Sequence, residues 1–148
     1  MVTCSTINLP RHAVGTQHSL KVWRFGEPGA SPKIYIQASL HADELPASLA
    51  AAKLLPRLVA ADEAGKISGE IILVPVANPI GLNNVSLRTH NGRQHLPTGE
   101  NYNRGFHDVS DDVLNAIDGN MANGPEADTS LIKAEVARAL AAATPANE

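Results

Sequence analysis

A histidine and a glutamate three residues apart follow directly on an apolar segment, and they are the first candidates for chemistry. The apolar segment covers residues 33–38, and His41 and Glu44 come after it. Imidazole nitrogens and carboxylate oxygens are good zinc ligands, and a catalytic zinc commonly takes three protein ligands and leaves a fourth position for water. The pair therefore predicts two ligands of a zinc site. The alternative is a solvated polar turn, which is the commoner meaning of so short a motif.

A strand, a turn and a helix must position this pair. Residues 33–38 predict a strand, and residues 45–64 predict a helix with Pro46 in its first turn, where the missing N–H costs nothing. The turn after a strand can aim successive side chains at one point beyond the sheet edge. We therefore expect Glu44 at the mouth of the helix as a ligand, with the neighbouring Asp43 pointing elsewhere.

Two further segments extend this unit into a sheet. Residues 71–77 form a continuous apolar run, typical of a buried central strand that a helical crossover reaches. Residues 20–25 alternate and predict a half-exposed strand, paired antiparallel with residues 33–38 across the turn at residues 26–29. Pro56 should kink or divide the helix between them. The predicted fold class is α/β, a mixed sheet with helices on its faces and ligands gathered at the strand ends.

The segment at residues 78–112 is long and polar, and it predicts few elements of its own. A loop of that length in a compact domain is usually functional or disordered, and we favour a functional one. It begins with Asn78-Pro79-Ile80-Gly81 and later carries Asn103-Arg104-Gly105-Phe106. Its glycine, proline and asparagine residues supply turns that can fold it back over the His41 site.

The order of these motifs, a strand with His-x-x-Glu and a helix, a strand with Asn-Pro-x-Gly, and then Asn-Arg-x-Phe, resembles the succinylglutamate desuccinylase/aspartoacylase family, relatives of the zinc carboxypeptidases. The match spans roughly residues 33–107, and three motifs in order are more specific than one. The resemblance implies that His41 and Glu44 are the first two zinc ligands, and that Asn103 and Arg104 hold a substrate carboxylate. A planar guanidinium suits that task because it grips a carboxylate with two N–H groups.

The same resemblance implies a role in substrate contact for Arg93, a basic residue ahead of the Asn-Arg pair. Arg88 competes for that role, since loop lengths between these residues vary. Three histidines also lie in or beside the loop, but an exposed histidine is the commoner explanation and we assign them no role: His90, His95 and His107.

The chain departs from the family pattern towards its end. Enzymes of the family take a third zinc ligand, a histidine on a later strand, and a general-base glutamate from further along. Here the last predicted element is a helix at residues 129–143 with an apolar stripe of Ile132, Val136, Ala139 and Leu140. We predict the N-terminal portion of a zinc-carboxypeptidase-like domain, truncated at the C-terminus, and assign no catalytic residue.

Three functional readings follow from the resemblance. The first is a zinc-dependent hydrolase that cleaves the amide bond of an N-acyl amino acid such as N-succinylglutamate or N-acetylaspartate, with this chain carrying part of the site. A zinc carboxypeptidase is its close variant. The alternative is a non-catalytic module or subunit that binds a metal or a carboxylate.

Composition predicts one globular domain spanning residues 1–148, with 43% hydrophobic and 18% charged residues and a mean hydropathy of −0.11. A net charge of −3 and 3% aromatic residues argue against a nucleic-acid partner. The single cysteine, Cys4, excludes an internal disulfide, and residues 1–10 lack the pattern of a signal peptide. We expect a cytoplasmic protein without a membrane partner. A truncated sheet exposes an edge or an apolar face, so we also expect a homo-oligomer.

Overall fold

The protein divides into two compact units, Met1–Asn103 and Arg104–Glu148. The structure is a computed structural model that describes residues 1–10, 15–106, 108–111, 114–115 and 129–142. Each unit is described by itself, and the expected single domain over residues 1–148 stays a prediction. None of the helices described is long and apolar enough to cross a bilayer.

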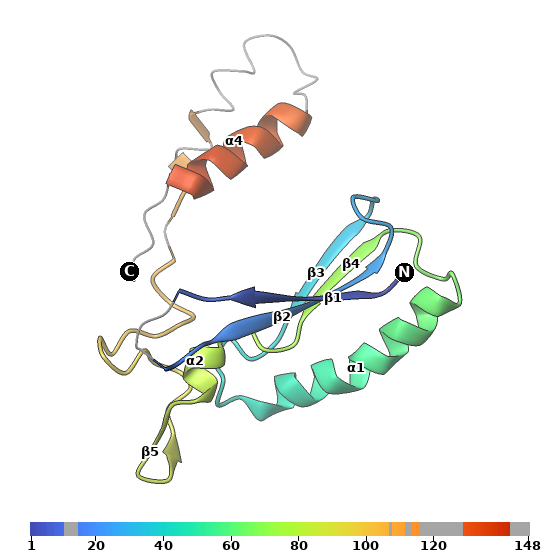
Figure 1. Cartoon of the computed structure of the whole chain (residues 1–148). Helices are drawn as coiled ribbons and strands as arrows, with labels where there is room; N and C mark the ends of the chain where they lie inside the picture. Colours follow the sequence, from blue (N-terminus) through green and yellow to red (C-terminus); the bar gives the residue numbers. More distant parts are fainter. Residues whose placement is uncertain (11–14, 107, 112–113, 116–128, 143–148) are drawn as a thin grey trace. The chain divides into compact units, whose positions relative to one another are not determined.

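The first unit is built on a four-stranded mixed sheet (Figure 1). The strand order is β1-β2-β4-β3. The neighbours β1 and β2 are antiparallel, as are β2 and β4, whereas β3 and β4 are parallel. This confirms the mixed α/β fold class. The bounds of the strands are Thr3–Asn8 for β1, Ser19–Gly26 for β2, Lys33–Gln37 for β3 and Glu70–Val74 for β4.

The predicted pairing of β2 with β3 is wrong, because β4 lies between them. One feature that favours this order is the carboxylate of Glu70, the first residue of β4. It forms ion pairs of 2.9 Å with Arg24 on β2 and with Lys33 on β3. A central place also suits the apolar residues of β4, since the strand then has hydrogen-bonded neighbours along both edges. Strand β1, at the other edge of the sheet, has no counterpart in the sequence-based prediction.

The helix α1 (Leu45–Glu63) crosses over from β3 to β4 and covers one face of the sheet (Figure 1). Its residues pack on a core of Phe25, Ala38, Ala51 and Leu73. The sequence predicts that Pro56 kinks or divides the helix; it does not divide it, since α1 is continuous through that residue, and the kink stays a prediction. Pro56 is exposed, whereas Leu55, Leu58 and Val59 around it pack against the core and hold both halves in place.

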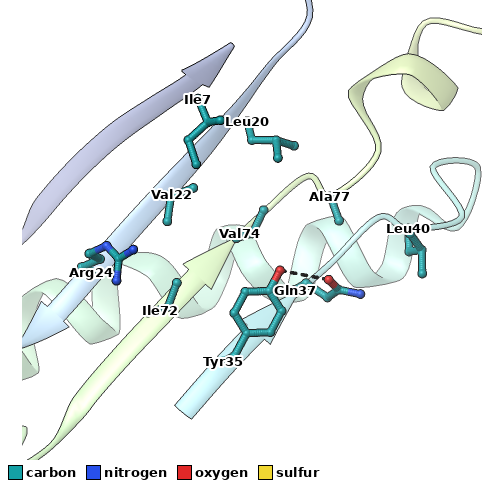
Figure 2. A pocket seen from close by; sticks show the side chains of 10 residues that line it. All are labelled: Ile7, Leu20, Val22, Arg24, Tyr35, Gln37, Leu40, Ile72, Val74 and Ala77. Carbon is teal, nitrogen blue, oxygen red and sulfur yellow. Dashed lines mark hydrogen bonds between the residues drawn. The ribbon is translucent and has the colours of Figure 1, made fainter. Parts of the chain in front are cut away.

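The opposite side of the sheet, here called the open face, is not covered by α1. Because side chains alternate along a strand, Val22, Ile72 and Val74 form a second apolar cluster there. They line a cavity of about 350 Å³ on this face, which Figure 2 shows with its polar edge at Tyr35 and Gln37. The open face is therefore an apolar surface of the first unit.

The second unit contains helix α4 (Thr129–Ala142), in agreement with the helix predicted there. Its apolar stripe is only partly realised. Ala139 is buried and Ile132 and Val136 are half-buried, but Leu140 is 57% exposed.

Candidate functional site

The turn that carries His41 leaves β3 in an unusual backbone conformation. Ser39 has a φ of 60°, the left-handed region that side chains other than glycine rarely adopt. It is nevertheless well buried, and its hydroxyl shares a hydrogen bond of 2.6 Å with the hydroxyl of Ser48 on α1. The backbone N–H groups of Ala77 and Asn78 also donate to the carbonyls of Ala38 and Ser39. The turn is thus held by both neighbouring elements.

The long polar segment after β4 has more structure than its sequence indicates. It contains a short helix, α2 (Pro79–Leu82), and a hairpin of β5 (Val85–Ser86) and β6 (Thr89–His90). Beyond the hairpin, Gln94 and Asn101 form an isolated antiparallel bridge. Residues of this last part contact His41, which confirms the prediction that the segment folds over the His41 site.

His41 is 7% exposed, and its ring has a partner on each nitrogen. Its Nδ1 lies 3.1 Å from Nη1 of Arg93, and its Nε2 lies 2.7 Å from Oδ1 of Asn101. A guanidinium can only donate, so Nδ1 must accept and its lone pair faces Arg93. Nε2 therefore carries the hydrogen and donates it to Asn101. This fixes the tautomer of a neutral His41.

Glu44 lies beside the same ring nitrogen. Its Oε1 is 3.4 Å from Nδ1 of His41, and it also accepts a short hydrogen bond from Nη2 of Arg93. Asp43 does not point elsewhere, as the sequence suggested, because its Oδ2 lies 3.6 Å from Nε of Arg93. The structure thus brings His41, Glu44 and Arg93 together, with Asp43 holding the arginine from its other edge.

Asn103 and Arg104 lie at the division between the two units. Asn103 lines a polar cavity of about 280 Å³ in the first unit, together with His41, Glu44 and residues at the end of β3. This places Asn103 beside the predicted ligand pair. Arg104 begins the second unit and has an exposed side chain. Its predicted role in binding a carboxylate stays a prediction.

Of the two arginines of the loop, Arg93 lies at the His41 site and Arg88 does not. Arg88 is exposed in the turn of the hairpin, with a φ of 68°, whereas Arg93 contacts His41. His90 and His95 bond to Gly81 and Thr98, respectively, and take no part in the site; His107 lies outside the described residues. Within the described ranges, no three histidine, cysteine, aspartate or glutamate side chains form a group able to hold a metal.

Asn101 is the site residue that the sequence reasoning missed. Its Oδ1 accepts both from Nε2 of His41 and from the backbone N–H of Asn103, at 2.9 Å. The second bond is a local turn in which an asparagine binds the N–H two residues on. The run Asn101-Tyr102-Asn103 carries that turn signal, but the partnership with His41 spans 60 residues and leaves no local trace.

Comparison with known proteins identifies the family of the chain. A family model of the succinylglutamate desuccinylase/aspartoacylase catalytic domain matches residues 30–123, more than half of the chain. The chain belongs to this family. The matched range includes the His41 turn, the whole α1–β4 unit and the loop with Arg93 and Asn101.

Two solved structures of the family share the fold. A protein from Shewanella frigidimarina NCIMB 400, described as a succinylglutamate desuccinylase/aspartoacylase, is 26% identical with a TM-score of 0.69, over 93% of this chain and 35% of its own. A family protein from Shewanella amazonensis SB2B is 32% identical with a TM-score of 0.67, over 89% of this chain and 34% of its own. This chain thus spans about a third of the length of these relatives. No curated protein matches it.

Proposed function

We propose that this chain carries one half of the active site of a zinc-dependent hydrolase, which cleaves the amide bond of an N-acyl amino acid. Membership of the succinylglutamate desuccinylase/aspartoacylase family supports the reaction class. The observation that carries the proposal is the pairing of His41 Nδ1 with Glu44 Oε1 at 3.4 Å beside a polar cavity. By the same resemblance, the acyl group is a small one such as succinyl or acetyl.

The distance between the two proposed ligand atoms, on His41 and Glu44, fits a zinc site. Zinc–nitrogen and zinc–oxygen bonds of about 2.0–2.2 Å at tetrahedral angles separate two ligand atoms by about 3.3–3.5 Å. The 3.4 Å between Nδ1 of His41 and Oε1 of Glu44 lies in that range. The hydrogen bond from Nε2 to Asn101 leaves the lone pair on Nδ1, as a ligand requires. The same two atoms already accept from a cationic group, the guanidinium of Arg93.

Each residue then has a distinct part in the proposed reaction. Zinc, when bound by His41 and Glu44, polarises a carbonyl and activates water. Arg93, which Asp43 holds from its far edge, presents a guanidinium next to that position for a carboxylate or a developing negative charge. Asn103 supplies an amide from the cavity wall, and we propose Arg104, its neighbour in sequence, as the second grip on the substrate carboxylate. We propose no general base among these residues.

One observation favours a second candidate function. The described residues bring together two ligand-type side chains and no third. A module that binds a metal or a carboxylate without catalysis needs no more than that. The two candidates differ in a simple assay, since only the hydrolase releases an amino acid from N-succinylglutamate or N-acetylaspartate.

Zinc content tests the zinc site that the hydrolase and a metal-binding module would share. We expect purified protein to bind zinc in a His41-dependent and Glu44-dependent manner, measured by elemental analysis after equilibrium dialysis against a limiting zinc concentration. His41→Ala and Glu44→Ala should each lose most of the metal. His95→Ala serves as the matched control, because His95 lies in the same loop and its ring contacts Thr98 and Tyr102, not His41. Equal zinc in all four proteins would refute the assignment of these ligands.

A further inference from the structure

Asn78 lies after strand β4, and two of its hydrogen bonds go to the His41 turn. It is 5% exposed. Its Nδ2 donates to the carbonyl of Leu40 at 3.0 Å, and its Oδ1 accepts from the backbone N–H of Gly81 at 2.8 Å. Its own backbone N–H donates to the carbonyl of Ser39 at 3.2 Å. One buried residue therefore binds the carbonyls of the two residues that precede His41.

The bond to Leu40 has a direct effect on the position of His41. A peptide group is planar, so fixing the carbonyl of Leu40 also fixes the N–H and the Cα atom of the next residue. The residue before Leu40, Ser39, has a left-handed backbone conformation. This conformation costs energy for any residue other than glycine. Hydrogen bonds from outside the turn must hold this conformation, and Asn78 supplies two of them.

The same residue links the His41 turn to the segment that carries Arg93. A Cβ atom on Gly81 would lie 2.4 Å from Nδ2 of Asn78 and 2.7 Å from the carbonyl oxygen of Gly92. Gly92 in turn accepts from the N–H of Ala42 at 3.0 Å, directly after His41. Helix α2, the Arg93 segment and the His41 turn therefore pack backbone to backbone around Asn78.

We propose that Asn78 is a positioning residue for the metal ligands, which sets the direction of His41 through the carbonyl of Leu40. This gives a role to the Asn-Pro-Ile-Gly motif that the zinc assignment does not use. The inference rests on the proposed function for the identity of the metal, zinc. The conformation of His41 itself is a separate, metal-free consequence.

The substitution Asn78→Asp tests this with the least change. It keeps an oxygen that can accept from Gly81 N–H and so cap α2, but it replaces the donor to Leu40 with an acceptor. We expect zinc affinity, measured by competition with a chromophoric chelator, to fall about 10–100-fold. In metal-free protein, we expect long-range ¹H–¹⁵N spectra to show His41 as the Nε2–H tautomer in the wild type and as a mixture in the variant.

Two controls separate positioning from general loss of stability. Val22→Ala removes packing in the other apolar cluster and should lower thermal stability while leaving zinc affinity and the His41 tautomer unchanged. Asn83→Ala removes an exposed amide at the end of α2 and should change neither. Wild-type zinc affinity and an unchanged tautomer in Asn78→Asp would overturn the inference. If the wild type binds no zinc, the proposed function fails, and the tautomer alone then decides the role of Asn78.

Discussion

At the scale of single residues, the two nitrogens of the His41 ring have separate tasks. Asn101 takes the hydrogen of Nε2 at 2.7 Å, so that Nδ1 is left with its lone pair facing Glu44 and Arg93. An amide oxygen is a neutral acceptor, and a carboxylate in its place would attract the Nε2 hydrogen more strongly and make the imidazole a more electron-rich ligand. Asn101 thus orients His41 without adding a charge to the site.

Arg93 offsets part of the negative charge of this cluster. It faces Asp43 and Glu44, and one guanidinium cannot neutralise both carboxylates. The cluster of the two carboxylates and the arginine therefore carries a net negative charge when both acids are ionised, which favours a cation beside Nδ1 of His41. If His41 and Glu44 held the proposed metal, the two N–H groups of Arg93 that bond to them here would be left for a substrate carboxylate, with Asp43 beside Nε of the arginine.

Glu70 supports the fold through charge, and its effect should depend on pH. The pKa of Glu70 is lowered from its ordinary value of 4.5, first by the hydrogen bond from Lys33 and then by the N–H of Gly29 and by Arg24, against the opposing effect of desolvation. A lowered carboxyl pKa adds stability above the unfolded-state value, and this is lost as the pH falls through the folded-state value. Glu70→Gln should therefore destabilise the protein most near neutral pH.

Urea unfolding at several pH values checks this. We expect the difference in unfolding free energy between the wild type and Glu70→Gln to be constant from pH 7 to about pH 5.5 and to shrink steadily below about pH 4.5. Glu63→Gln, at the exposed end of α1, controls for the loss of one negative charge. A difference that stays the same down to pH 3 would show that the carboxylate of Glu70 does not carry the effect.

At the scale of elements, the site depends on close contact between two turns. Gly92 lies against the His41 turn, and a Cβ atom there would come 2.5 Å from the backbone nitrogen of Asp43 and 2.8 Å from the carbonyl carbon of Ala42. Both are backbone atoms, so they cannot yield as a flexible side chain does. Gly92→Ala must push the Arg93 segment away from His41.

We expect Gly92→Ala to lower both stability and zinc affinity, the latter at least tenfold, because Arg93 and Asn101 move with Gly92. Gly99→Ala is the matched control. Gly99 has a φ of 76° but an added Cβ meets no atom within 4 Å, so this variant should lose about 1–2 kcal/mol from backbone strain alone and keep its zinc affinity. Thermal unfolding and chelator competition measure both effects. Equal zinc affinity in the two variants would contradict the steric argument.

The elements themselves were predictable where the signal is local. The apolar run of β4, the strand before His41 and the helix with Pro46 in its first turn all follow from period and punctuation in the sequence. The strand order was not predictable from local signals. The same strand sequences are compatible with a β2–β3 hairpin and with β4 placed between β2 and β3. What decides between them includes Glu70, whose two ion pairs join residues far apart in the chain.

The candidate site divides in the same way. His41, Glu44 and Arg93 were accessible from the motifs, and the structure brings them together. Asn101 and Asp43 were missed or misplaced, because their partners depend on how the loop after β4 folds back. The continuity of α1 through Pro56 was also beyond local reasoning, since packing of Leu55 and Val59 on the core outweighs the lost hydrogen bond.

At the scale of the whole molecule, the open face of the first unit carries a cavity with an apolar floor of Val22, Ile72 and Val74. Ile7 on β1 is 50% exposed at its rim, next to Leu20 and Val22 on β2. Figure 2 shows these side chains converging above the sheet with Val74 and Ala77. The floor residues Val22, Ile72 and Val74 are buried, so Ile7 is the exposed apolar side chain at this rim, and exposed apolar side chains favour association. We therefore propose that copies of the chain associate through the open face.

Sedimentation velocity tests this proposal. We expect the wild type to sediment as a dimer or larger species at micromolar concentration, and Ile7→Lys to shift it towards the monomer, because burying an unpaired ammonium in an apolar interface costs several kcal/mol. Leu49→Lys is the matched control, since Leu49 is an apolar residue on α1, 58% exposed and remote from the open face. It adds the same charge and should leave association unchanged. A monomeric wild type would refute self-association, and an equal shift in both variants would place the contact elsewhere than on the open face.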